Sequence, residues 1–399
     1  MKRLMVGVLL VILVANVSAQ RLAGTGRQVQ APDPAAGEAL AGLTTAQRAD
    51  FAAGRGEFAE AEDVNDGLGP VFNERSCTDC HNAPATGGGS RRTVTRFARR
   101  TNGVFDALAS LGGSLRQDHA IGGRDGSPHN FRPEIVPPAA TIVVQRRSTP
   151  LFGLGLVDAT PDSDFLAMAQ QQAARGNGVA GRANVVDNIR AGMKTVGKFG
   201  WKAQVPSIFQ FSGDAYLNEL GITTPDFPNE SCPQGDCSEL AFNPAPGIND
   251  DGAGVIALTN FMTMLAAPPR GTQTGDVTAG EATFDRIGCT ACHVATLRTG
   301  SNPIAALDRK TYHPYSDFLL HDMGSLGDGL EMGSATGSEM RTAPLWGLRF
   351  ITTYLHDGRA RTLDQAILAH DGQARGARDS YANLEAAGKA KLIAFLQSL

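Results

Sequence analysis

Two short stretches of the sequence combine residues that can do metal or redox chemistry, and both read Cys-x-x-Cys-His. They lie 212 positions apart in a chain of 399 residues. The residues concerned are Cys77, Cys80 and His81 in the first stretch, and Cys289, Cys292 and His293 in the second.

Three chemistries use cysteines at this spacing. A structural zinc site needs four ligands from two neighbouring knuckles, and no finger-like pattern fills the long interval between these stretches. A redox Cys-x-x-Cys pair does not require a histidine directly after it in both copies. Cys-x-x-Cys-His is the attachment signature of haem c, in which both cysteine sulfurs bond to the haem and the histidine becomes an axial ligand. The sequence therefore predicts two covalently bound haems c, with His81 and His293 as iron ligands.

The first 19 residues have the three parts of a secretory signal peptide. Basic "MKR" precedes the apolar run "LMVGVLLVILV", and "VSA" ends at Ala19 as a small-residue cleavage site. The apolar run is too short for a membrane-spanning helix. We expect an exported protein of the bacterial periplasm without a membrane span, in which residues 20–44 form a flexible N-terminal segment.

The remaining composition agrees with export. The formal net charge is −4, and loss of Lys2 and Arg3 with the signal peptide makes the mature chain more acidic. Nucleic-acid binding needs clustered positive charge, so nucleic acid is excluded as a partner. Cys232 and Cys237 close the short loop "CPQGDC", and in an oxidising compartment a disulfide is the default expectation for such a pair.

The surroundings of the two motifs repeat, which indicates a duplication. Phe72 and Phe284 each lie five residues before the first cysteine, and "RSTPLFGL" (147–154) is matched by "RTAPLWGL" (341–348). Each half also ends in an apolar stretch with helical spacing, at 254–269 and at 392–399. We expect two cytochrome-like domains, residues 45–268 and 269–399, with the first enlarged by insertions.

Several longer stretches resemble the bacterial dihaem cytochrome c peroxidase and MauG-like superfamily. They are "CHNAPATGGGS", "STPLFGLGLVDATPD", "GKFGWKAQVPSIFQFSGDAYLNELGIT", "YSDFLLHDMG" and "RTAPLWGLRFITTYLHDGRARTLDQAILAH". The resemblance is nearest to the dihaem oxidoreductase branch that is sometimes labelled thiol oxidoreductases. It implies a mainly α fold of two cytochrome c-like haem domains that face each other, with loop insertions in the first. It also implies that the C-terminal haem takes up electrons and the N-terminal haem meets peroxide.

The resemblance suggests a sixth ligand for the second haem. Counting along "YLHDGRARTLDQAILAH" puts His370 where the peroxidases carry methionine and MauG-type enzymes carry tyrosine. A histidine there stabilises ferric iron and lowers the potential of that haem. His321 and Met323 are the alternative sixth ligands, and His356 matches a position near the haem that need not bind iron.

The resemblance also implies a catalytic set beside the first haem. Trp201 matches the tryptophan between the haems, and Gln210 and Glu219 match a distal glutamine and glutamate, each at a spacing one or two residues short. A carboxylate in a dry pocket can move a proton between the two oxygens of peroxide. The alternative interpretation is a core tryptophan and a solvated glutamate.

Other residues are candidates for binding a haem or a calcium ion. Arg147 and Arg341 occupy matching positions in the two repeats and suit haem propionates, because guanidinium binds carboxylates bidentately. His119 and His129 lie in a loop rich in glycine and proline, where either can cap the first haem or be a surface residue. "GINDDGAG" (247–254) offers oxygen ligands for calcium but lacks a recognised calcium-loop spacing.

These features together predict an exported dihaem c-type oxidoreductase of peroxidase type. Its substrates would be hydrogen peroxide and a small molecule or protein to oxidise, and its electron donor would be a small periplasmic cytochrome c or a cupredoxin. The alternative is a non-catalytic dihaem electron-transfer cytochrome in which protein ligands fill both axial positions of each iron.

Overall fold

The computed structural model describes residues 35–122 and 130–399. The expected signal peptide, residues 20–34 of the expected N-terminal segment, and His129 lie outside the described residues. In the described ranges, no helix is both long enough and apolar enough to cross a membrane.

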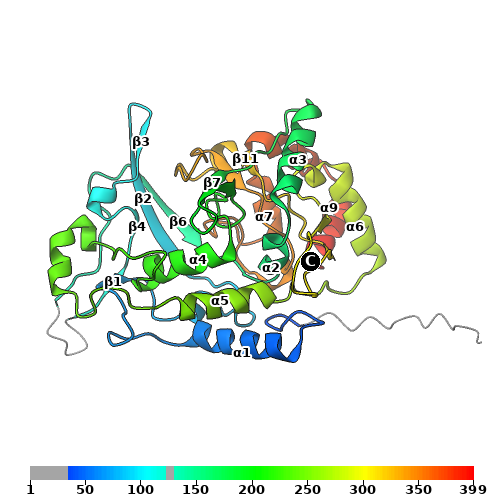
Figure 1. Cartoon of the computed structure of the whole chain (residues 1–399). Helices are drawn as coiled ribbons and strands as arrows, with labels where there is room; N and C mark the ends of the chain where they lie inside the picture. Colours follow the sequence, from blue (N-terminus) through cyan, green and yellow to red (C-terminus); the bar gives the residue numbers. More distant parts are fainter. Residues whose placement is uncertain (1–34, 123–129) are drawn as a thin grey trace, which may run out of the picture. The chain divides into compact units, whose positions relative to one another are not determined.

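Helices are the commonest regular elements and make up 34% of the structure (Figure 1). The α-helices are α1 (Thr45–Ala59), α2 (Leu154–Asp158), α3 (Asp162–Ala174), α4 (Ile208–Ala215), α5 (Ala253–Met264), α6 (Gly275–Arg286), α7 (Leu363–Leu368), α8 (Arg375–Ala382) and α9 (Ala386–Leu396). A π-helical turn, η3 (Tyr216–Leu220), continues α4. Short 3₁₀ segments are η1 (Cys77–Asp79), η2 (Ala109–Leu111), η4 (Pro233–Gly235), η5 (Cys237–Phe242), η6 (Cys289–Ala291), η7 (Gly324–Leu326), η8 (Leu348–Phe350) and η9 (Gly372–Ala374).

Several helices begin where a hydroxyl side chain caps the first turn. Thr44, Ser207, Thr274 and Thr362 each accept a hydrogen bond from the backbone N–H three residues later, at the starts of α1, α4, α6 and α7. Such caps satisfy backbone donors that no earlier carbonyl reaches, and each stabilises its helix by about 1 kcal/mol. The helices predicted near the end of each half are present as α5 and α9.

The strands are short and antiparallel. They are β1 (Val71–Phe72), β2 (Thr93–Thr101), β3 (Val104–Asp106), β4 (Ser114–Leu115), β5 (His119–Ala120), β6 (Ile142–Arg147), β7 (Val185–Asn188), β8 (Met193–Val196), β9 (Leu297–Arg298), β10 (Thr311–Tyr312), β11 (Leu320–Asp322) and β12 (Glu339–Arg341). Strand β2 pairs with β3, β4 and β6, and the other pairs are β1–β5, β7–β8, β9–β10 and β11–β12.

The sheet around β2 corrects the expectation that loops alone enlarge the first half. Strands β2 and β6 pair over six positions, from Thr93 opposite Arg147 to Ala98 opposite Ile142. β-branched residues favour this conformation, and the arginines of "RTVTRFARRT" obscure their alternation in the sequence. The inserted segment is therefore built on an antiparallel sheet as well as on loops.

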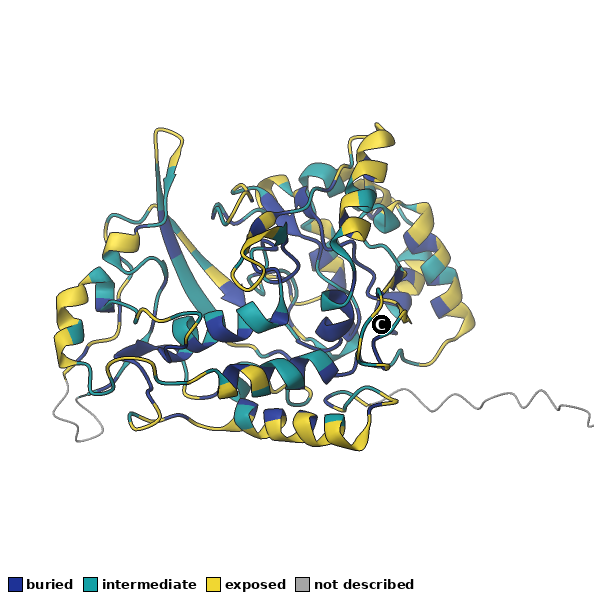
Figure 2. Cartoon of the chain, viewed as in Figure 1, coloured by how far each residue is buried: buried dark blue, intermediate teal, exposed yellow. Residues whose placement is uncertain are grey.

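Each half has a closely packed helix pair, α1 with α5 and α6 with α9 (Figure 1). A Cβ on Gly54 would lie 2.1 Å from the Ala257 carbonyl oxygen, and a Cβ on Gly280 would lie 2.0 Å from the Lys391 carbonyl oxygen. Only glycine permits this approach of the two backbones at each crossing. Figure 2 shows the exposed face of α1, whose buried residues Phe51, Gly54 and Phe58 pack toward α5. Equivalent glycine crossings support the duplication.

One repeat inferred from the sequence has no equivalent in space. The Phe284 ring lies 6.0 Å from the His293 ring, but the ring at the matching distance of 6.1 Å from His81 is that of Phe58. Phe72 stacks instead on His119, at 5.7 Å. In both halves a phenylalanine of the helix before the motif packs against the motif histidine, Phe58 of α1 and Phe284 of α6. Phe72 has the sequence spacing of Phe284 but not its packing role, because it lies in β1 rather than in that helix.

A buried ionic cluster joins residues of the two halves. Asp328 contacts Arg146 at 2.6 Å and Lys202 at 3.1 Å, and the side chains of Lys202 and Asp328 have no exposed area. The Lys202 ammonium also donates to the carbonyl oxygens of Thr336 and Gly337. The described residues form one compact unit, and the boundary between residues 268 and 269 stays a prediction.

The crossing of α1 and α5 can be tested with two substitutions in the same helix. We expect Gly54→Ala to lower the free energy of unfolding by about 1–3 kcal/mol, because the added methyl group overpacks against the Ala257 carbonyl. Gly56→Ala is the control, since its Cβ would have no atom within 4 Å, and it should stabilise by up to about 1 kcal/mol. Thermal and denaturant unfolding measure both. Equal effects of the two changes would contradict the close approach.

Candidate functional site

The second Cys-x-x-Cys-His stretch follows α6 directly and turns through η6. Gly288, with φ of 92°, connects them in the left-handed region that glycine enters without steric cost. The His293 backbone N–H donates to the Cys289 carbonyl oxygen at 3.0 Å, so the histidine closes a helical turn that starts at the first cysteine. Both cysteines of the motif are free thiols. The turn presents two sulfurs and one imidazole together.

This motif lines a large cavity. The cavity measures about 610 Å³ and also receives His370, which follows α7. Its volume lies within the range of roughly 300–1,000 Å³ that is usual for ligand and cofactor sites. Most of the wall is apolar, with side chains that include Phe284, Leu345, Leu348, Ile351, Leu363 and Ile367. The site therefore combines an apolar shell with four histidines, His293, His321, His356 and His370.

Two of these histidines, His293 and His370, are oriented in the same way. Nδ1 of His293 lies 2.8 Å from the Tyr315 carbonyl oxygen, and Nδ1 of His370 lies 2.8 Å from the Ala366 carbonyl oxygen. A carbonyl can only accept, so Nδ1 carries the proton and Nε2 is left with a lone pair for a metal. Burial lowers the pKa of both side chains, that of His293 to about 4. Both imidazoles are neutral and are ready to act as ligands.

Residues of the first half reach the wall of the same cavity. Trp201 Nε1 donates to the Arg147 carbonyl oxygen at 3.0 Å, and the Trp201 ring meets the His356 ring edge-on at 6.2 Å. The Arg341 backbone N–H donates to the Trp201 carbonyl oxygen at 2.9 Å. Trp201, Arg147, Arg341 and His356 all line the cavity. Arg147 and Arg341, expected from the repeat, thus meet at one site.

The first Cys-x-x-Cys-His stretch has the same local form. It turns through η1, and the His81 backbone N–H donates to the Cys77 carbonyl oxygen at 2.9 Å. His81 Nδ1 lies 3.0 Å from the Gly88 carbonyl oxygen, which again leaves Nε2 free for a metal. Burial lowers the pKa of His81, so this imidazole is neutral too.

Glu219 lies beside this first motif, on the π-helical turn η3. Its backbone oxygen accepts from the Asn73 N–H at 2.7 Å, and its carboxylate Oε2 accepts from Asn73 Nδ2 at 2.7 Å. Burial raises the pKa of Glu219. Burial and then the Glu219 charge raise the pKa of the Cys80 thiol to about 11, which reflects the closeness of the two groups. A protonatable carboxylate therefore stands next to the first motif.

A protein-family model described as "Di-haem oxidoreductase, putative peroxidase" matches residues 139–399. The match covers well over half of the chain. The chain belongs to this family. Membership makes it a di-haem oxidoreductase by family, and the family implies haem cofactors.

Comparison with solved structures gives distant likenesses. Hydrazine synthase of Kuenenia stuttgartiensis has 18% identity and a TM-score of 0.28, over 44% of this chain and 65% of that one, so this chain spans less than two thirds of its length. A MauG-like protein associated with microbial copper homeostasis has 13% identity and a TM-score of 0.39, over 88% and 89% of the two chains. A dihaem peroxidase from Burkholderia thailandensis has 14% identity and a TM-score of 0.35, over 85% and 86%. A search of the curated proteins found no match.

The cavity at the second motif of this dihaem oxidoreductase fits a haem c. Two thiols, one adjacent imidazole and a second imidazole line an apolar space, and two arginines stand at its wall. Arg147 Nε is buried and has no hydrogen-bond partner among residues 35–122 and 130–399, although its guanidinium also donates to the Thr353 carbonyl oxygen. An unpaired buried donor on this wall is suited to a propionate carboxylate.

Gln210 is not beside Glu219, although the sequence suggested one catalytic set. It starts α4, where its side-chain oxygen accepts from the Ile189 N–H at 3.0 Å and its amide donates to the Asp187 carbonyl oxygen at 3.1 Å. Both ends of the side chain thus bind the β7–β8 hairpin. Nine positions separate Gln210 from Glu219, and the two lie at opposite ends of α4 and η3, so we do not assign Gln210 to peroxide.

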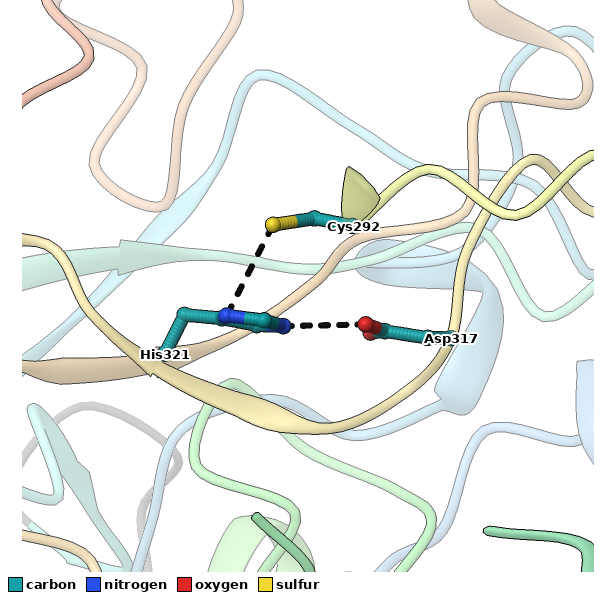
Figure 3. Close-up of side chains that lie close together, drawn as sticks. All are labelled: Cys292, Asp317 and His321. Carbon is teal, nitrogen blue, oxygen red and sulfur yellow. Dashed lines mark hydrogen bonds and ion pairs between the residues drawn. The ribbon is translucent and has the colours of Figure 1, made fainter. Parts of the chain in front are cut away.

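His321 is engaged on both ring nitrogens and is not available as an iron ligand. Nε2 contacts Asp317 Oδ2 at 2.9 Å, and Nδ1 contacts Cys292 Sγ at 3.6 Å (Figure 3). Nδ1 also lies 2.8 Å from Gln373 Oε1. Met323 also lines the cavity. Of the two histidines among the three expected candidates, His370 is the one whose Nδ1 binds a backbone carbonyl and leaves Nε2 as a ligand.

The remaining expectations have structural explanations. His119 lies in β5, stacks on Phe72 and contacts Asp118 at 2.8 Å, with 48% of its side chain exposed. In the proposed calcium segment, Asp250 accepts from the N–H groups of Gly252 and Gly254 at the start of α5. This carboxylate caps a helix, and we do not propose calcium there. Cys232 and Cys237 form the expected disulfide.

Sequence reasoning missed Asn73 and Asp317. Asn73 orients Glu219 from 146 positions away, and Asp317 pairs with a histidine that the sequence offered as an iron ligand. Asp317 stands within the quoted stretch "YSDFLLHDMG", whereas Asn73 had no signal beyond its place four residues before Cys77.

We expect His370→Ala to change the spin state of one haem. Loss of the second imidazole removes a strong-field axial ligand, so a low-spin ferric signal should become high-spin in the electron paramagnetic resonance spectrum. His313→Ala is the control, because His313 is exposed and its ring bonds to the Thr296 hydroxyl. An unchanged low-spin signal in the His370 variant would show that another group is the ligand.

Proposed function

We propose that this protein is an exported dihaem c-type oxidoreductase of peroxidase type that reduces hydrogen peroxide. The reaction consumes two electrons and two protons and yields two waters. The observation that carries the proposal is the partly buried Glu219 carboxylate, which Asn73 holds beside the first haem motif. A carboxylate with a raised pKa is what proton transfer near neutral pH requires.

The haems would be covalently attached. We assign Cys77 and Cys80 to the first haem and Cys289 and Cys292 to the second. His81 would be the axial ligand of the first haem, and His293 with His370 would be the pair on the second. When bound, the haems supply the electron storage and peroxide chemistry that the side chains lack, and two imidazoles favour a low potential at the second haem.

Glu219 would move the proton. Asn73 occupies Oε2, so we assign Oε1 to take a proton from the inner oxygen of peroxide and to return it to the outer oxygen as that oxygen leaves as water. The buried setting supports this role because it disfavours a permanent charge and keeps the carboxyl group able to exchange a proton. The neutral amide of Asn73 fixes the orientation of the carboxylate.

Electrons would enter at the second haem and pass to the first by way of Trp201. The hydrogen bond from Trp201 to the Arg147 carbonyl and its edge contact with His356 support this path, because they hold an aromatic ring between the two repeats. We propose a small periplasmic cytochrome c or a cupredoxin as the donor. The signal-peptide pattern of residues 1–19 supports export to the periplasm.

Glu219→Gln tests the proposal. We expect kcat for peroxide reduction to fall roughly 10²- to 10⁴-fold, the usual contribution of general acid–base catalysis. Glu230→Gln is the matched control: burial also raises the pKa of Glu230, to about 7, but its oxygen accepts from the Ser231 N–H, outside the site. Stopped-flow assays with a reduced donor measure the rates. Equal rates in all three proteins, or a wild type whose two low-spin haems ignore peroxide, would favour the electron-transfer cytochrome instead.

The pH profile gives a second test. Glu219 must be ionised to accept a proton, so kcat/KM should fall as the pH drops through its raised pKa. The Asn73 donor stabilises the carboxylate, and Asn73→Ala should therefore raise that pKa and move the acid limb upward by roughly one pH unit. A rate loss in Asn73→Ala with an unmoved acid limb would show that Asn73 has only a structural role.

A further inference from the structure

His321 and Asp317 form an ion pair at the edge of the cavity that the second motif lines. Neither residue is one of the assigned iron ligands. His321 and Asp317 are 1% and 0% exposed in their side chains, and His321 Nε2 meets Asp317 Oδ2 at 2.9 Å. The other ring nitrogen faces Cys292, a haem attachment residue (Figure 3). A histidine and a carboxylate buried this deeply beside a redox centre contribute their charges with little solvent screening.

The hydrogen bonds define the protonation of His321. Gln373 Oε1 lies 2.8 Å from His321 Nδ1, and the same amide accepts from the Ala180 N–H at 3.2 Å and donates to the Ala180 carbonyl oxygen at 3.3 Å. These two bonds to Ala180 fix the amide with its oxygen toward the ring. Nδ1 therefore faces an acceptor and Nε2 faces a carboxylate, which requires a proton on each. Burial opposes this charge, and the hydrogen bond to Asp317 raises the pKa of His321.

Asp317 also accepts hydrogen bonds from further donors. Gln172 Nε2 donates to Oδ2 at 2.7 Å, and the Leu319 N–H donates to Oδ1 at 3.0 Å. The Asp317 N–H itself donates to the Cys292 carbonyl oxygen at 3.0 Å, so the pair is tied to the haem motif through the backbone. Gln172 belongs to α3, so the first half also contributes to holding this carboxylate.

We propose that His321 and Asp317 are positioning residues that set the reduction potential of the second haem through their opposed fixed charges. The imidazolium stabilises the reduced haem, which carries one more electron, and the carboxylate stabilises the oxidised haem. Nearby charge and burial are among the levers that a protein has on haem potential. The inference rests on the proposed covalent haem at Cys289 and Cys292.

The test is spectroelectrochemical titration of the full-length, haem-loaded protein at pH 8, with three variants. His321→Gln keeps hydrogen-bonding capacity but leaves the Asp317 charge uncompensated, so the potential of the second haem should fall by about 59 mV, a tenfold change in the one-electron equilibrium. Asp317→Asn should leave the potential unchanged or raise it. The double variant should return close to the wild-type potential, because both charges are gone. His313→Gln is the exposed control.

Different outcomes separate this inference from the proposed function. Haem content per chain, measured by mass and by the alkaline pyridine spectrum, reports whether the second haem is attached, and its absence from the wild type would overturn both. If the haem is attached and its low-spin signal is intact, an unshifted potential in His321→Gln would overturn the charge pair alone. A double variant whose potential stays as low as that of His321→Gln would do the same, because removing both charges should restore a potential that the charges set.

Discussion

The hydrogen bond between a backbone carbonyl and Nδ1 of a buried histidine is the contact on which both candidate haem sites depend. It recurs at His81 with Gly88, at His293 with Tyr315 and at His370 with Ala366. A free imidazole can present either nitrogen, and this contact leaves only Nε2 as a ligand. Placing the carbonyl group of Tyr315 for this contact has a conformational cost. Tyr315 has a φ of 51°, a left-handed conformation that costs a residue other than glycine roughly 1–2 kcal/mol.

The surroundings of Tyr315 offset that cost. Its hydroxyl donates to Glu281 Oε1 at 2.5 Å, and its ring packs edge-on against Phe395 at 5.5 Å and Phe284 at 6.3 Å. Phe284 also packs against His293. The helix pair α6–α9, which closes over a glycine, thus supports both the proximal histidine and the residue that orients it. Strain at one backbone position is maintained because the surrounding core over-determines it.

The two sites differ in what stands near them, and this asymmetry suits a division of labour. The second has two imidazoles in an apolar cavity and a charge pair at its edge. The first has a carboxylate on a π-helical turn, a feature that recurs at functional sites. The Tyr216 hydroxyl anchors that turn by donating to Glu57 on α1 at 2.5 Å.

Trp201 and Arg147 are the sequence neighbours of Lys202 and Arg146, which belong to the buried ionic cluster. Unpaired charges in that cluster would be costly. Pairing with Asp328 holds this segment in place.

The sequence by itself determined the features that depend on a few neighbouring residues. The Cys-x-x-Cys-His turns, the disulfide loop, the capped helix starts and the helix before the double proline all form through contacts within a few positions. The duplication and the family likeness were also legible in the sequence, and they led to His370. Tertiary structure alone decided which distant residues share a site. Gln210 and Glu219 are near in sequence but bind different partners, whereas Asn73 and Glu219, or Arg147 and His356, are remote and meet. Packing and the pairing of buried polar groups decide which distant residues meet. The free energy of these contacts depends on the whole chain rather than on any local pattern.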